Sequence, residues 1–216
     1  YSEGYAGIGV WRAAFKPFVD RIADTDIRLQ WFCCDRSTGV TDASGNRITL
    51  IRDTQSPVAV EYQAVKFIGT GRDNIKAGVF SGWELGDYIY LRSEEAYMIK
   101  MEALAHKGSA EAVTELNSFM KTRQPDYNYT FTNKADLIEE IIYQKRVEFW
   151  GEGLEYIDNR RLNIPVDRTD ETWGAENNNH FSAGKFRYNQ EDRPFLYQLP
   201  LSEIENNSQL SPSDQN

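Results

Sequence analysis

Apolar positions recur at helical spacing in the segment 134–150, and this is the clearest hydrophobic pattern in the chain. Asn133 and Asp136 are placed to cap a helix at its start, and the helix is predicted to continue through Trp150. Gly151 and Gly153 should then end it. The apolar stripe consists of Leu137, Ile138, Ile141, Ile142, Val147 and Phe149. A second, shorter helix is expected after Gly153 and should carry Asp158 and Arg161.

An earlier pair of helices is predicted upstream of this one. The first should begin near Tyr88 and break at Gly108, after which Ser109 can cap the second. Pro125 prevents that second helix from continuing beyond Gln124. Because the connection is short, the two helices should be antiparallel neighbours, as in a tetratricopeptide unit. The predicted fold class is therefore mostly α, with tetratricopeptide-like antiparallel helical pairs, long loops and a few short β-strands.

The segments on either side of the helices are richer in turn signals. Residues 1–87 are predicted to be loop-rich with short strands, residues 88–162 to form helical repeats, and residues 163–216 to form a loop-rich closing segment, all within one domain. Short strands are expected within 58–68 and 181–188, and residues 208–216 are expected to fray.

Charged residues gather where the third helix meets the fourth. The acids Glu148, Glu152 and Asp158 lie between the arginines Arg146 and Arg161, on either side of the two glycines. Opposite charges three or four residues apart on a helix can pair, and arginine binds carboxylates especially well. These five side chains are therefore predicted to be substantially buried and mutually paired at the corner between the helices, which favours a structural role.

The same residues carry a family resemblance. The segment 146–161 matches the signature RxExxxEGxxxxDxRR, and it resembles the C-terminal part of the SusD/RagB family of surface nutrient-binding lipoproteins of Bacteroidetes-type outer membranes. Two further segments support the resemblance: LRSEEAYMIKMEALAHKG at 91–108 and FLYQLPLSEIENN at 195–207. In addition, DTDIR at 24–28 resembles the family's D-x-R turn.

This resemblance implies a binding function without catalysis. A family member would capture oligosaccharides or polysaccharides at the cell surface and hand them to a SusC-like TonB-dependent outer-membrane transporter. It also implies a surface-exposed outer-membrane lipoprotein, anchored by a lipidated cysteine on a longer N-terminal part. No cofactor is implied, and the protein is not expected to be an enzyme.

Composition narrows the range of partners. The 216 residues carry a net charge of −9 with only 24 Lys and Arg, which argues against binding to nucleic acid or to an anionic membrane surface. No stretch approaches the roughly twenty apolar residues that span a bilayer. Cys33 and Cys34 are adjacent and suit buried thiols better than a disulfide framework, while His106 and His180 are too few for a metal site.

Aromatic residues provide the candidate ligand contacts. The chain has 5 Trp, 12 Tyr and 11 Phe, and several lie in polar, Gly-rich surroundings. A pyranose ring stacks its C–H face on Trp or Tyr, while fixed polar groups bind its hydroxyls. The predicted ligand-binding residues are Trp83, Trp11, Trp31, Tyr5 and Asn74. The structural alternative is that such tryptophans fill gaps between loops and helices.

Two alternative functions stay open at this stage. The helices could form an interaction scaffold that holds the transporter while the protein binds a non-carbohydrate nutrient such as peptide. A glycoside hydrolase would need two carboxylates with different pKa values, whereas Glu148 and Glu152 lie among arginines. Glu84 and Asp87 are close to Trp83 in the sequence and could approach a bound sugar, so they are the acids to mutate in a test for hydrolysis.

Overall fold

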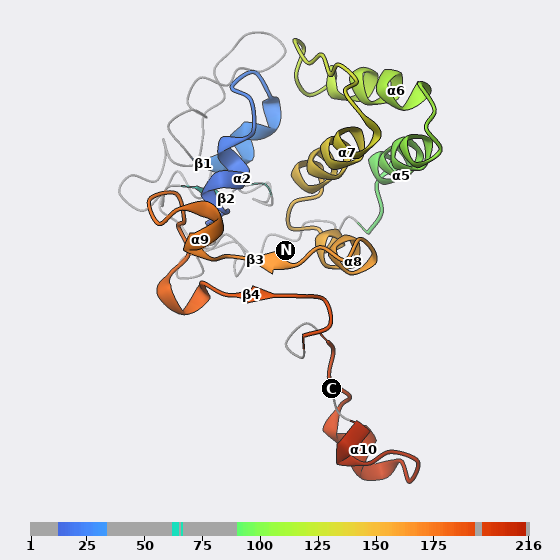
Figure 1. Cartoon of the computed structure of the whole chain (residues 1–216), viewed down its shortest axis with the longest axis vertical. Helices are drawn as coiled ribbons and strands as arrows, with labels where there is room; N and C mark the ends of the chain where they lie inside the picture. Colours follow the sequence, from blue (N-terminus) through green and yellow to red (C-terminus); the bar gives the residue numbers. More distant parts are fainter. Residues whose placement is uncertain (1–12, 34–61, 65, 67–89, 193–195, 215–216) are drawn as a thin grey trace, which may run out of the picture. The chain divides into compact units, whose positions relative to one another are not determined.

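The computed structural model describes residues 13–33, 62–64, 66, 90–192 and 196–214 (Figure 1). The chain groups into two compact units, 1–148 and 149–216. The described residues are mostly helical with short antiparallel strands, which confirms the predicted fold class. The sequence predicts one domain across both units, and this stays a prediction.

The described part of the first unit opens with short elements. Helix α2 spans Lys16–Asp20 and is followed by the 3-10 helix η1, Ile27–Trp31. Strand β1, Phe32–Cys33, then pairs antiparallel with β2, Gln63–Ala64, in the register Phe32 to Ala64. Strand β2 lies within the strand expected at 58–68, of which most lies outside the described residues.

Three longer helices follow in the described part of this unit. Helix α5 spans Ser93–His106, α6 spans Glu111–Met120 and α7 spans Lys134–Glu148. Helix α5 packs against both α6 and α7 (Figure 1). The core of the described part of the first unit consists mainly of Met and branched aliphatic side chains that are almost fully buried: Leu29, Met98, Met101, Leu116, Met120, Ile141 and Val147.

The helix boundaries follow from local chemistry. Asn133 Oδ1 accepts a hydrogen bond from the backbone N–H of Asp136 at 3.0 Å, so the predicted cap of α7 is present. The helix ends at Glu148, slightly before the predicted end at Trp150. Gly151 follows with a φ of 77°, a left-handed conformation that glycine adopts without steric cost and that an α-helix cannot include.

The second unit is built from short elements. Helix α8 spans Leu154–Arg161, α9 spans Asp170–Trp173 and α10 spans Leu201–Asn206. Strands β3, Val166–Asp167, and β4, Arg187–Tyr188, pair antiparallel (Figure 1).

Two expectations for this unit need correction. The strand expected at 181–188 is confined to β4, because Ser182–Gly184 form the 3-10 turn η3. The expected frayed tail at 208–216 contains a further 3-10 turn, η5, Pro212–Asp214. That turn is held locally, since the Asp214 carboxylate accepts a hydrogen bond from the Ser211 backbone N–H at 2.7 Å.

Among the described residues, no helix has the length and apolar character needed to cross a membrane. The same described part of the chain contains no group of His, Cys, Asp and Glu side chains that could hold a metal ion.

Candidate functional site

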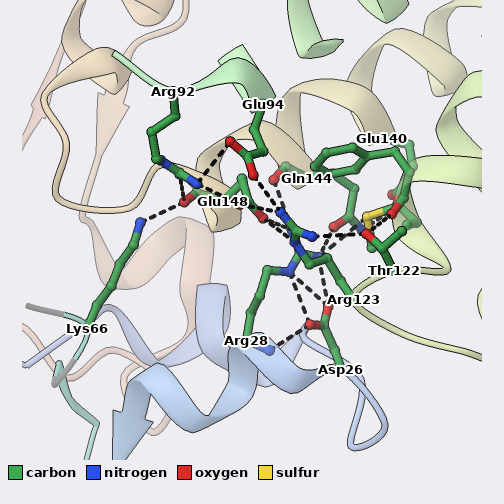
Figure 2. Close-up of polar contacts among 12 residues, drawn as sticks. Asp26, Arg28, Lys66, Arg92, Glu94, Thr122, Arg123, Glu140, Gln144 and Glu148 are labelled. Atoms are coloured by element: carbon green, nitrogen blue, oxygen red, sulfur yellow. Dashed lines mark hydrogen bonds and ion pairs between the residues drawn. The ribbon is translucent and has the colours of Figure 1, made fainter. Parts of the chain in front are cut away.

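A buried polar site in the described part of the first unit is centred on Glu148, the last residue of α7 (Figure 2). Its carboxylate is only 1% exposed and contacts three arginines. Oε1 accepts from Arg92 Nη1 and Arg123 Nη2, both at 3.0 Å. Oε2 accepts from Arg123 Nε at 3.2 Å and from Arg28 Nη1 at 3.4 Å. One carboxylate therefore ties η1, the start of α5 and the segment after α6 to the end of α7.

The backbone carbonyl of Glu148 also accepts hydrogen bonds. It accepts from Lys66 Nζ at 2.6 Å and from Arg92 Nη2 at 2.9 Å. The last carbonyl groups of a helix lack partners within the helix and carry partial negative charge, so they attract cations. Two positively charged side chains from distant parts of the sequence thus converge on the C-terminal end of α7 (Figure 2).

A second layer of the site orients Arg28, which is fully buried. Asp26 caps η1 by accepting from the Arg28 backbone N–H at 2.9 Å, and it pairs with the guanidinium through Nη2 at 2.7 Å. Arg28 Nη2 also donates to Gln144 Oε1 at 2.5 Å, and Gln144 Nε2 donates to Glu140 at 2.7 Å. The D-x-R turn recognised at 24–28 is therefore part of the ion-pair network.

The electrostatics of the site keep Glu148 ionised. Burial alone raises the pKa of the Glu148 carboxyl, but the hydrogen bonds and charge of Arg123, together with Arg28 and Arg92, outweigh burial and lower that pKa to about 2. General acid catalysis near neutral pH needs a carboxyl whose pKa is raised toward the working pH. A carboxylate with a lowered pKa in a buried arginine cluster suits a structural role.

The signature residues divide between the two units. Glu148 is buried in the first unit, and Asp158 is buried in the second. Asp158 Oδ1 pairs with Arg161 Nε at 2.7 Å within α8. The expected burial of Arg161 is wrong, because its side chain is 39% exposed. It lies in the last turn of α8 and reaches Asp158 through Nε.

Arg146 and Glu152 are half-buried. Glu148 contacts Arg28, Arg92 and Arg123, and all three lie outside the signature. The sequence did not predict them as partners of Glu148. The D-x-R turn at 24–28 contains Arg28 and the family-like segment 91–108 contains Arg92, but neither match identified its arginine as a partner of Glu148.

Of the predicted ligand-binding residues, the structure describes Trp31. It is half-buried at the end of η1, and the ammonium of Lys66 lies over its ring, 4.5 Å from the ring centroid. The other four predicted residues, Tyr5, Trp11, Asn74 and Trp83, lie outside the described residues, as do Cys34, Glu84 and Asp87.

Comparison with known proteins completes the description of the site. A family model described as the SusD family matches residues 59–216. The fold is similar to the crystal structure of a SusD-like carbohydrate binding protein from Bacteroides vulgatus ATCC 8482, with a TM-score of 0.59 at 22% sequence identity. The match covers 89% of this chain and 40% of that chain. No curated protein matches the chain.

Proposed function

Because the chain belongs to the SusD family, we propose that it captures glycans at the cell surface, leaves them chemically unchanged, and delivers them to a SusC-like TonB-dependent outer-membrane transporter. The observation that carries the proposal is the family match over residues 59–216. The proposal includes a location in the outer membrane through a lipid anchor on a longer N-terminal part. The fold's similarity to a carbohydrate binding protein supports the choice of glycans as the ligand class.

The close packing of the chain around Trp31 supports a binding role. Residues next to Trp31 are held firmly, since Leu29 and Phe32 are fully buried and Arg28 is tied to Glu148. Recognition residues are often carried by less regular segments that a rigid scaffold positions. We propose Trp31, Trp83, Trp11, Tyr5 and Asn74 as ligand contacts, with the aromatic rings stacking on sugars and the amide binding hydroxyl groups.

The first test is titration calorimetry against a panel of plant, host and microbial oligosaccharides. Trp31→Ala is expected to weaken binding of the best ligand about tenfold or more, because the sugar loses an aromatic surface to stack on. Trp173→Ala is the control, since Trp173 is a partly exposed tryptophan in the second unit whose Nε1 donates to the Asp167 carbonyl. Equal affinities for Trp31→Ala and the parent protein would remove Trp31 from the site.

The absence of turnover is tested separately. A bound oligosaccharide should be recovered uncleaved by mass spectrometry after prolonged incubation, since the buried carboxylate of Glu148 has a lowered pKa and faces arginines. Cleavage that disappears in Glu84→Gln or Asp87→Asn would overturn the proposal and assign hydrolysis to these acids.

A second candidate role is supported by the surface of α5. Tyr97 and Ile99, on different faces of this helix, are each 53% exposed and are available for protein contacts. The helices would then act as a scaffold for the transporter while the protein binds a non-carbohydrate nutrient such as peptide. Peptides included in the calorimetric panel distinguish the two roles, because a peptide ligand without any glycan ligand would favour the scaffold.

A further inference from the structure

The position of Lys66 is not explained by the network around Glu148 alone. Its ammonium group donates to the backbone carbonyl of Glu148 at 2.6 Å and lies 4.5 Å from the centroid of the Trp31 ring. Lys66 therefore joins the C-terminal end of α7 to an aromatic side chain at the end of η1. A lysine that only neutralised the helix end would not need to lie over an indole.

We infer that Lys66 is a positioning residue for Trp31: it fixes the indole so that a sugar ring can stack on the part of it that the ammonium leaves uncovered. This inference rests on the proposed function, because it assigns Lys66 a role in glycan binding through Trp31. Lys66 itself is not required to contact the ligand.

The backbone beneath Trp31 is already fixed. Trp31 is the last residue of η1, in which Asp26 caps the start and the Arg28 and Leu29 side chains are fully buried. Phe32, the next residue, is fully buried in β1. Trp31, by contrast, stays half-exposed, so packing leaves its side chain more torsional freedom than it leaves the buried side chains of its neighbours.

Lys66 can remove that freedom. A cation over the face of an indole is attracted by the ring's electron-rich face, and tryptophan gives the strongest such contact among the aromatic residues. The carbonyl of Glu148 holds the same ammonium from the helix side, where the partial negative charge of the helix end favours a cation. An aromatic ring that is ordered before binding avoids the entropy cost of being ordered by the ligand.

The contact also determines which part of the ring can accept a sugar. An ammonium 4.5 Å from the centroid excludes a pyranose from the region of the ring that it covers. Stacking then takes place on the rest of the indole, which gives the bound sugar a defined side of approach. Loss of Lys66 should therefore reduce affinity and alter ligand preference.

The experiment uses two measurements on the same variants. Fluorine NMR of protein labelled with fluorotryptophan reports the surroundings of Trp31, and Trp31→Phe assigns its resonance. Calorimetry with the best oligosaccharide reports affinity. The variants are Lys66→Gln, which removes the charge, Lys66→Arg, which keeps it, and Lys100→Gln as a control for loss of an exposed lysine, here one that pairs with Glu115 at 2.6 Å.

We expect Lys66→Gln to shift the Trp31 resonance in the free protein and to weaken glycan binding about two- to tenfold, the cost of ordering one side chain on binding. Lys66→Arg should retain most of the affinity, and Lys100→Gln should match the parent protein. A purely structural lysine would lower the melting temperature but leave the affinity of the folded protein unchanged.

The outcomes separate the inference from the proposed function. An unchanged Trp31 resonance in Lys66→Gln would overturn the inference, as would unchanged affinity in a panel where Trp31→Ala weakens binding; in both cases glycan binding itself would stand. A parent protein that binds no glycan in the panel would overturn both.

Discussion

Glu148→Ala is expected to lower the free energy of unfolding by about 3–5 kcal/mol, because it removes one partner of a buried ionic network and leaves the others charged. The Glu148 side chain is 1% exposed, and the fully buried Arg28 would keep its charge with one carboxylate fewer. Arg92 and Arg123 would also lose the carboxylate oxygen that each contacts at 3.0 Å.

This loss can be measured by urea and thermal denaturation. A change of this size corresponds to a drop in melting temperature of about 6–20 °C for a chain of this length. Glu139→Ala is the matched control on the same helix, because the Glu139 side chain is 75% exposed and lies 3.6 Å from Arg21. Exposed ion pairs contribute little, so the control should melt within a few degrees of the parent protein. Equal melting of Glu148→Ala and Glu139→Ala would refute the structural role of Glu148.

The second large effect expected is a loss of stability in acid that depends on Glu148. The pKa of its carboxyl falls from an ordinary value of 4.5 to about 2 in the folded protein. A carboxyl with a lowered folded pKa binds protons more weakly in the folded than in the unfolded state, so protonation favours unfolding. The stabilisation is complete above about pH 4.5 and is lost as the pH falls through 4.5 toward 2.

The magnitude of this linkage is about 3 kcal/mol, because the pKa is lowered from 4.5 to about 2 and each tenfold change in proton affinity corresponds to about 1.4 kcal/mol. The pKa of Asp167 is also lowered to about 2, because hydrogen bonds from Thr169, Thr172 and Arg187 outweigh the opposite effect of burial. Acid unfolding of the parent protein therefore includes more than one carboxylate.

The contribution of Glu148 is isolated by comparison with Glu148→Gln, which cannot ionise. Urea unfolding at pH values from about 7 down to about 3 gives the stability difference between the two proteins. That difference should be largest at neutral pH and should shrink below about pH 4.5. A difference that stays constant with pH would show that Glu148 does not titrate with a lowered pKa.

Local sequence predicted the four helices α5 to α8 of this protein, although α5 begins at Ser93 and not near Tyr88. Helix α7 was predictable from apolar residues at helical spacing, from the cap at Asn133 and from Gly151, because each of these acts over a few neighbouring residues. Helix α8 and the break at Gly108 followed from the same short-range chemistry. The family resemblance also came from sequence alone, through the signature at 146–161, and the SusD family match over residues 59–216 confirms it.

The partners of the signature acids were decided by the tertiary structure. Glu148 was expected to pair within its own segment, yet the arginines that contact it lie 120, 56 and 25 residues away, at Arg28, Arg92 and Arg123. Helical spacing indicates which face of a helix is buried, but it does not indicate which distant side chain meets that face. An acid buried at a helix end requires positive charge nearby, and only the packing of η1, α5 and α6 around α7 determines which arginines supply it. For the same reason, sequence could nominate Trp31 as a ligand contact, while only the folded chain places the ammonium of Lys66 over its ring.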